Sequence, residues 1–246
     1  MARRVSLPRG RSIWLHVAFL AVVANVIPWA LVAWAQRGVT SALTAVLYSL
    51  IPLMTLLISA ALSVEILTFR RIAGMITASI GTLVIVGFEP TLSQSAVPVF
   101  AVLVACSLLA SGAVYAKRFV TARVAALPMV TLQLAMAFLV SAPLALLFDG
   151  APRWEQLTPA VLGASLTLGA VGTGLAFLMY YILIENIGAT NTMMISYVIP
   201  IIGVVAGGVI LSEPITASLL TGGAAIVAGV WLSQGARQPL IGGLDG

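Results

Sequence analysis

Residues 97–116 read VPVFAVLVACSLLASGAVYA, a stretch of twenty residues without one charged side chain. A helix of about 20 apolar residues is long enough to cross the hydrocarbon core of a bilayer. The stretch is apolar throughout and does not alternate between apolar and polar residues, as the strands of a membrane barrel do. Because lipid requires a spanning segment to satisfy its own backbone hydrogen bonds, the stretch predicts a membrane-spanning helix.

Seven further stretches of the same kind lie on either side of this one. The sequence therefore predicts an all-α integral membrane protein with eight transmembrane helices, over residues 13–35, 42–62, 72–88, 97–116, 127–148, 160–184, 193–211 and 215–232. The composition agrees, because 61% of the 246 residues are hydrophobic and 8% are charged, against about 25% charged residues in a soluble domain. The same composition excludes a disordered chain.

The few cations are sorted by loop. Cytoplasmic loops carry an excess of Lys and Arg. One side of the predicted membrane has Arg37 and Arg153, and the other has ten cations, which are Arg3, Arg4, Arg9, Arg11, Arg70, Arg71, Lys117, Arg118, Arg123 and Arg237. This bias predicts a multi-pass protein of the cell (inner) membrane with both termini in the cytoplasm. Because the net charge of +5 comes from so few, sorted residues, we expect no nucleic-acid partner.

The chain matches itself at an offset of 148 residues. The matches are of residue types that have specific backbone roles: Ile51-Pro52 falls on Ile199-Pro200, Glu65 on Glu213, Thr68 on Thr216, and Gly74, Gly81 and Gly87 on Gly222, Gly229 and Gly235. The offset corresponds to five helices, and an odd number of helices inverts the orientation of a repeat in the membrane. Inverted repeats that enclose a substrate site are common in secondary transporters.

The repeat predicts how the chain is divided. A first half over residues 1–88 has three helices, a linker spans 89–96, a second half over 97–235 has five helices, and a tail spans 236–246. With five helices in each unit, the first half is two helices short. We therefore expect a ten-helix architecture with an incomplete first half, in a chain that is truncated or mis-started.

Two stretches carry a family resemblance. Residues 37–65, from Arg37-Gly38-Val39-Thr40 through Ile51-Pro52 to Glu65, resemble the EamA family of the drug/metabolite transporter (DMT) superfamily, and so do residues 188–214, from Gly188-Ala189-Thr190 through Ile199-Pro200 to Glu213-Pro214. The resemblance covers about residues 10–235. It implies ten helices in two inverted halves around a central cavity, and export or exchange of small metabolites such as amino acids.

Intramembrane polar residues are the candidates for a substrate site, because a polar group at mid-bilayer is costly and is a functional hypothesis by default. The predicted cavity residues are Asn25 and Trp29, one turn apart on one helix face, with Tyr48, Gln133, Ser196 and Tyr197. Pro28, Pro52 and Pro200 each remove a helical hydrogen bond, which predicts kinks that serve either packing or gating. Tyr180 and Tyr181 are instead typical of an aromatic belt at the membrane surface.

The repeated glutamates and glycines favour structural roles. Ser212-Glu213-Pro214 has the pattern of a helix start, so that Glu65 and Glu213 are interpreted as complements of helix dipoles. Glycines seven residues apart share one helix face and allow close packing of helices. The glycines of this kind are Gly74, Gly81, Gly222 and Gly229.

The middles of the predicted spans contain no Asp, Glu, Lys or Arg, which favours a neutral or zwitterionic, amino-acid-like solute. We predict a secondary transporter, an exporter or exchanger that works by alternating access across the lipid bilayer without cofactor or metal. A non-transporting fragment or partner subunit is the alternative, and a homo-oligomer stays open. An intramembrane enzyme is disfavoured, since Asp149 and Asp245 lie outside the spans and His16 is the only histidine.

Overall fold

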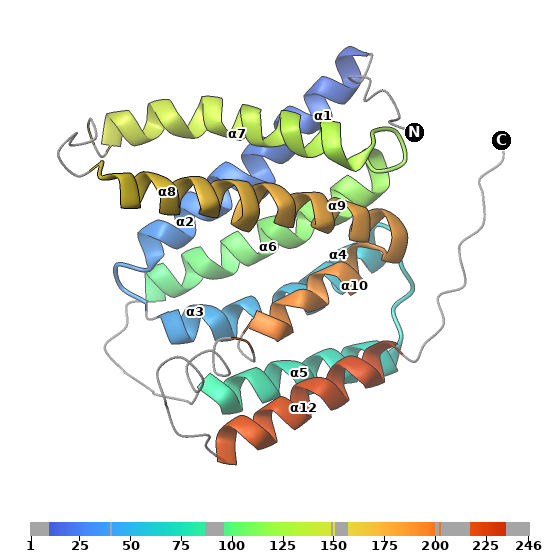
Figure 1. Cartoon of the computed structure of the whole chain (residues 1–246). Helices are drawn as coiled ribbons and strands as arrows, with labels where there is room; N and C mark the ends of the chain where they lie inside the picture. The colour runs from blue at the N-terminus through green and yellow to red at the C-terminus, as the bar shows by residue number, and fades with distance from the viewer. Residues whose placement is uncertain are drawn as a thin grey trace, which may run out of the picture.

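The computed structural model describes residues 10–39, 41–86, 96–148, 150, 157–199, 202 and 217–234. Every regular element within these residues is a helix. The prediction of an all-α chain is therefore confirmed. Figure 1 shows most of the helices running across the molecule in roughly one direction, as expected of a bundle that crosses a membrane.

The first part of the chain forms six helical segments and one π-helical turn. α1 (Arg11–Ala21), the π-helical turn η1 (Val22–Val26) and α2 (Ile27–Ala35) make one continuous span. The predicted helix over 42–62 is divided at Ser49-Leu50 into α3 (Ser41–Tyr48) and α4 (Ile51–Ala61). The next two helices are α5 (Phe69–Val86) and α6 (Ala96–Phe119).

The second part also contains a span with a π-helical segment. α7 (Ala126–Phe148) precedes a long span made of α8 (Pro159–Thr167), the π-helical segment η3 (Leu168–Leu175) and α9 (Ala176–Ile187). The segments α10 (Ala189–Met193), the 3-10 helix η4 (Met194–Tyr197) and α12 (Ala217–Gln234) follow. The predicted helix over 193–211 thus begins earlier, at Ala189, and its last part lies outside the described residues.

Five of the described helical segments are long and apolar enough to cross a membrane. They are Arg11–Ala35, Leu43–Ala61, Ala96–Phe119, Ala126–Phe148 and Pro159–Ile187. The chain is therefore a multi-pass membrane protein. The total of eight spans stays a prediction.

Helical residues recur at the offset found in the sequence. Residues 69–86 of α5 correspond to residues 217–234 of α12 when 148 is added, and all of these residues are helical. The same shift carries η1, residues 22–26, to residues 170–174, which lie inside η3. Both π-helical segments thus occupy matching places in two spans that begin 148 residues apart.

Charged residues separate to the two ends of the bundle. We call the end where α1, α5 and α7 begin the cation-rich end, because six of the described Lys and Arg residues lie there: Arg11, Arg70, Arg71, Lys117, Arg118 and Arg123. Arg37 follows α2 at the opposite end. Among the described residues, the predicted sorting of cations is present.

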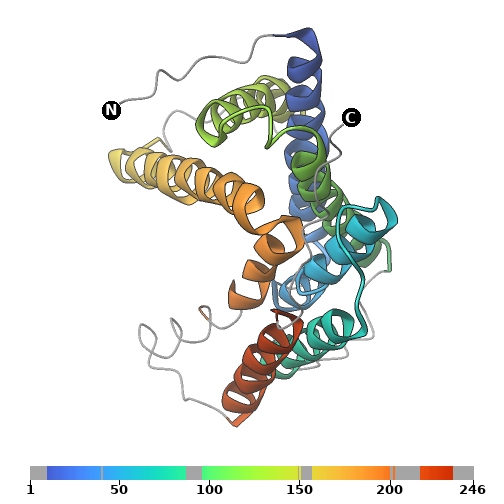
Figure 2. The same ribbon diagram turned by 90° about the vertical axis from the view of Figure 1, so that its right-hand side faces the viewer.

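The closest helix pair is α5 with α12, which pack antiparallel at one edge of the molecule (Figure 2). A Cβ atom on Gly81 would lie 2.6 Å from the Gly222 carbonyl oxygen, and one on Gly222 would lie 2.6 Å from the Gly81 carbonyl oxygen. Gly74 and Gly229 meet in the same reciprocal way. Glycine permits this approach because no side chain separates the two backbones.

The main core is centred on α6, which packs against α2 and α4. Its buried face consists mostly of small residues, including Ala105, Cys106, Ala110 and Ala113. Small side chains bring helices together by contact between backbones, which replaces the hydrophobic driving force that is absent between helices in lipid. This packing fixes η1 and α2 on one side of the cavity described next.

Candidate functional site

A cavity of about 710 Å³ lies between the first span, α7 and the η3–α9 segment. The first span contributes most of the wall, and the lining residues are Asn25, Val26, Trp29, Ala30, Ala33, Trp34, Arg37, Ser141, Leu144, Ala145, Phe148, Thr173 and Phe177. Trp34, Arg37 and Phe148 lie where α2 and α7 end. The cavity therefore runs from mid-span at Asn25 toward the end opposite the cation-rich end.

A buried hydrogen-bonded network closes the inner end of the cavity. Gln133 Nε2 donates to Asn25 Oδ1 at 2.6 Å, and the Tyr181 hydroxyl donates to Gln133 Oε1. Asn25, Gln133 and Tyr181 are 7%, 0% and 2% exposed. Buried polar groups are tolerated when they find partners, and here one side chain from each of three spans supplies them.

The local sequence explains why Asn25 points into the bundle. Pro28 has no backbone N–H to donate, and its ring clashes with the carbonyl oxygen of Ala24, four residues earlier. The helix widens just before the proline into the π-helical turn Val22–Val26, with Pro28 in the first turn of α2. π-helical turns of this kind are frequent at functional sites, and this turn contains Asn25.

The cavity wall is largely apolar and carries one charge among its described residues. Trp29, Trp34, Phe148 and Phe177 supply the aromatic surface, and Arg37 at the outer end is the only charged residue among the described lining residues. Ser141 and Thr173 add hydroxyl groups. Such a wall can enclose the apolar part of a small solute while polar groups at the inner end fix its orientation.

The structure brings together three of the predicted cavity residues. Asn25 and Trp29 line the cavity, and Gln133 holds Asn25 from behind. Tyr48 packs against the main core and does not line this cavity.

Ser196 and Tyr197 lie on the other side of the molecule, against the α5–α12 pair. Ser196 Oγ donates to the Met193 carbonyl oxygen at 2.9 Å, and the Tyr197 hydroxyl donates to the Met75 carbonyl oxygen at 3.0 Å. Neither residue lines the cavity. A role of Tyr48, Ser196 or Tyr197 in binding substrate stays a prediction.

The predicted kink residues are placed at interruptions of helices. Pro28 follows the π-helical turn, and Pro52 lies in the first turn of α4, directly after the division at Ser49-Leu50. The Ser49 carbonyl oxygen, exposed by that division, accepts the Ser79 hydroxyl at 3.0 Å. Pro200 and Glu213 lie outside the described residues.

Sequence reasoning assigned Tyr181 to the membrane surface, and that assignment was wrong. The residue is buried and bound to Gln133. Reasoning from single spans also missed Thr173 and Phe177. A usable signal existed, because the repeat offset of 148 carries Asn25 to Thr173 and Trp29 to Phe177, and all four residues line the cavity.

A helical membrane bundle with a cavity that extends from buried polar groups to one end of the bundle is an arrangement that membrane transporters use. Within this class the chain belongs to the EamA-like transporter family, whose model matches residues 2–87 and 96–234. The chain is similar to an uncharacterized transporter of Archaeoglobus fulgidus, with 24% identity over 194 residues that cover 79% of this chain and 68% of the relative.

A solved structure supports the fold. The chain resembles a protein of known crystal structure with a TM-score of 0.75 and 22% identity, over 92% of this chain and 76% of the other. At this identity the likeness speaks for the fold alone.

Proposed function

We propose that this membrane transporter is a secondary exporter or exchanger of a small neutral or zwitterionic metabolite that resembles an amino acid. The observation that carries the proposal is the cavity with Asn25 at its inner end and aromatic side chains along its wall. The ammonium and carboxylate of an amino acid lie at one end of the molecule, where the inner amides can bind them, and Arg37 at the outer end can attract an anionic group that enters the cavity. The wall contains no carboxylate, histidine or cysteine among its described residues, which favours transport over catalysis.

We propose further that the two halves, over residues 1–88 and 97–235, are inverted repeats that work by alternating access. The π-helical segments at matching places, residues 22–26 and 170–174, support this, and so does the division of the family match into 2–87 and 96–234. The reciprocal contacts of Gly81 with Gly222 are what a two-fold axis between α5 and α12 would produce, since such an interface is self-complementary.

The same reasoning orients the protein in the cell (inner) membrane. The cation-rich end would face the cytoplasm, with both termini on that side, because cytoplasmic loops carry the excess of Lys and Arg. The cavity would then be open toward the outside. A lipid bilayer and one small-molecule substrate are the partners that this arrangement requires, and a homo-oligomer stays open.

Transport measurements with purified protein in proteoliposomes test the proposal. Vesicles loaded with one unlabelled L-amino acid at a time would be assayed for uptake of the same labelled compound by counterflow. For the compound that is transported, Asn25→Ala and Trp29→Ala should each lower the rate roughly tenfold, because a buried hydrogen bond or a stacked ring is worth about that factor.

Trp14→Ala is the matched control, because Trp14 lies on the same span, is 37% exposed and does not line the cavity. Its rate should stay within twofold of the unmodified protein. If a transported compound moves equally fast in the Asn25 and Trp29 variants, the cavity is not the substrate site.

A further inference from the structure

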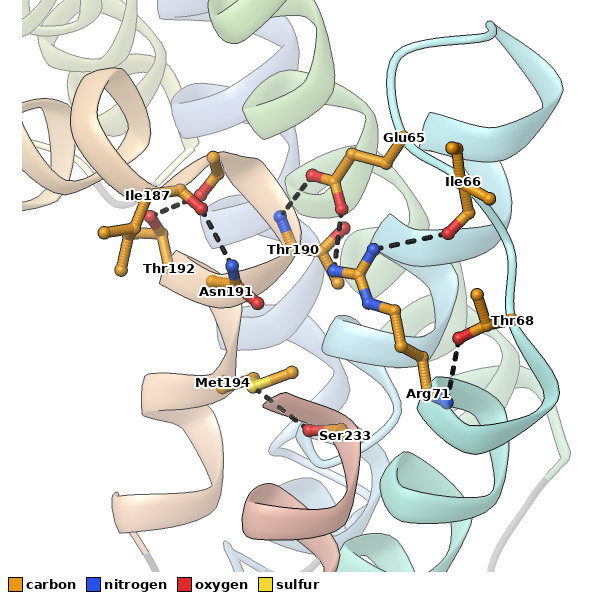
Figure 3. A network of polar contacts seen from close by, with 11 residues as sticks. Glu65, Ile66, Thr68, Arg71, Ile187, Thr190, Asn191, Thr192, Met194 and Ser233 are labelled. Atoms are coloured by element: carbon orange, nitrogen blue, oxygen red, sulfur yellow. Dashed lines mark hydrogen bonds and ion pairs between the residues drawn. The ribbon is translucent and has the colours of Figure 1, made fainter. Parts of the chain in front are cut away.

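The loop between α4 and α5 holds a buried ion pair at the cation-rich end. Arg71 Nη2 donates to Glu65 Oε2 at 2.8 Å, and the exposed fractions of the two side chains are 4% and 5%. Arg71 is itself held by its own loop, since its backbone N–H donates to Thr68 Oγ1 and its Nη1 to the Ile66 carbonyl oxygen, both at 3.4 Å. Figure 3 shows the guanidinium fixing the carboxylate in one orientation.

The second oxygen of the same carboxylate reaches the other half of the chain. Glu65 Oε1 accepts the Thr190 backbone N–H at 3.2 Å, across 125 residues of sequence (Figure 3). Thr190 lies in the first turn of α10, where backbone amides have no partner within their own helix. The bond is charge-assisted and therefore stronger than one between neutral groups. The α4–α5 loop and α10 are thus joined through one side chain.

Two other polar contacts at this end are exposed, unlike the contacts of the Glu65 carboxylate. Arg118 Nη1 donates to the Leu62 carbonyl oxygen at 2.5 Å, and Lys117 Nζ donates to the Glu185 carbonyl oxygen at 2.7 Å, both in exposed settings. Exposed charges exchange such contacts for water at little cost. The Glu65 carboxylate is buried, so that separating it from Thr190 without admitting water leaves a buried charge with fewer partners.

Burial along α7 decreases from the cation-rich end to the opposite end. On α7 the buried residues Met129, Val130 and Gln133 lie near its start, whereas Leu147 and Phe148 at its end are 79% and 84% exposed. Ala189 and Met193 of α10 are buried in the main core. Near the cation-rich end α7 and α10 are therefore packed into the core, and the cavity extends toward the other end.

We propose that Glu65 is a latch that keeps the cation-rich end closed by binding Arg71 with one oxygen and the α10 amide of Thr190 with the other. The proposal rests on the alternating access proposed above. Opening this end moves α10 away from the α4–α5 loop and breaks the Thr190 bond, and water that enters takes over the Oε1 lone pairs. The latch sets the balance between the two open states and contributes no contact to substrate.

Two cysteine reporters in nanodiscs test the latch without any substrate. The native Cys106, which is buried, is replaced by Ala in the background. One reporter is Met193→Cys, 8% exposed at the closed end, and the other is Ser141→Cys on the cavity wall. The rate of labelling by a membrane-impermeant maleimide is measured for each reporter alone.

Glu65→Gln should raise the labelling rate of the Met193 reporter roughly tenfold and lower that of the Ser141 reporter, because neutralising the carboxylate leaves Arg71 as a buried charge without its counter-ion. The double variant E65M/R71M should shift both reporters in the same directions, since it removes the acceptor without leaving a lone buried charge and so protects folding. Glu185→Gln is the matched control: Glu185 is exposed, and the variant should change neither rate.

Opposite shifts of the two reporters support the latch, even if no amino acid tested is transported. A faster Met193 reporter with an unchanged Ser141 reporter overturns it, because that result describes local loosening only. Unchanged reporters together with normal transport in the Glu65 variants also overturn the latch and leave the transport proposal standing.

Discussion

Gly81→Ala tests the close contact between α5 and α12. The added Cβ would lie 2.6 Å from the Gly222 carbonyl oxygen, 2.8 Å from the Ile226 nitrogen and 2.9 Å from Ile226 Cγ1, and real Cβ contacts essentially never fall under 3.0 Å. Because two of the three neighbours are backbone atoms, no side-chain rotation relieves the clash. α5 and α12 must separate by about 0.8 Å before ordinary contact at 3.4 Å is restored, which as overpacking costs about 1–3 kcal/mol.

The matched control is Gly223→Ala. Gly223 follows Gly222 on α12, and a Cβ added to it would meet nothing within 4 Å. Both variants share the gain in helix propensity of about 1 kcal/mol, so that their difference isolates the clash. Equilibrium unfolding in mixed detergent and SDS micelles, followed by circular dichroism, measures that difference in the free energy of unfolding. We expect Gly81→Ala to be less stable than Gly223→Ala by about 1–3 kcal/mol.

The reciprocal geometry adds a second result. Gly222→Ala should cost about as much as Gly81→Ala, because its Cβ would lie 2.6 Å from the Gly81 carbonyl oxygen. The double variant should cost less than the sum, since one separation of the helices relieves both clashes. Equal stability of the Gly81 and Gly223 variants would refute the close approach of α5 and α12.

Two further outcomes are expected from the buried polar groups. Gln133→Leu should lower the free energy of unfolding by about 1–3 kcal/mol, because it leaves both Asn25 and Tyr181 without their partner. Tyr181→Phe should cost closer to about 0.6 kcal/mol, the average for hydrogen bonds between membrane helices. The same SDS titration ranks the two variants, and the inverted order would contradict the network. Cys106 is fully buried, and its thiol lies 3.7 Å from the Leu47 carbonyl oxygen. Maleimide should therefore label Cys106 in nanodiscs at under about a tenth of its rate in SDS. Fast labelling in nanodiscs would contradict the packing around α6.

The local sequence was enough to predict the bounds of a helix where the length of an apolar stretch alone determines them. The uncharged stretch over 97–116 predicts α6 to within three residues at each end, because lipid leaves a spanning backbone no other way to satisfy its hydrogen bonds. The division of the helix over 42–62 at Ser49-Leu50 was not predicted, although Pro52 pointed to a bend nearby. A proline in the sequence shows where a helical hydrogen bond is missing. The partner of a freed carbonyl oxygen, such as the Ser79 hydroxyl that donates to Ser49, comes from the tertiary structure.

The site was less accessible to sequence reasoning. Asn25 and Gln133 could be singled out because an amide at mid-bilayer needs a partner, but their mutual bond is a fact of three-dimensional packing across 108 residues. Tyr181 was misplaced for the same reason. A tyrosine near a helix end has the same local pattern at the membrane surface and in a buried network, and the hydroxyl partner that distinguishes the two is far away in the sequence.

The two spans that begin 148 residues apart differ in how their polar residues are satisfied. Asn25 in η1 is bonded to Gln133 on α7, whereas its counterpart Thr173 in η3 donates to the Leu168 carbonyl oxygen of its own helix at 3.3 Å. Within the described residues, no side chain of α8 or η3 forms a hydrogen bond to another helix, and neither element has a buried residue. Moving the first span away from α7 would break buried hydrogen bonds, and moving α8 and η3 would break none. The two walls of the cavity therefore differ in the buried hydrogen bonds that hold them, although their sequences repeat. The polar side chain at the π-helical segment is satisfied by a neighbouring helix in one wall and by its own backbone in the other.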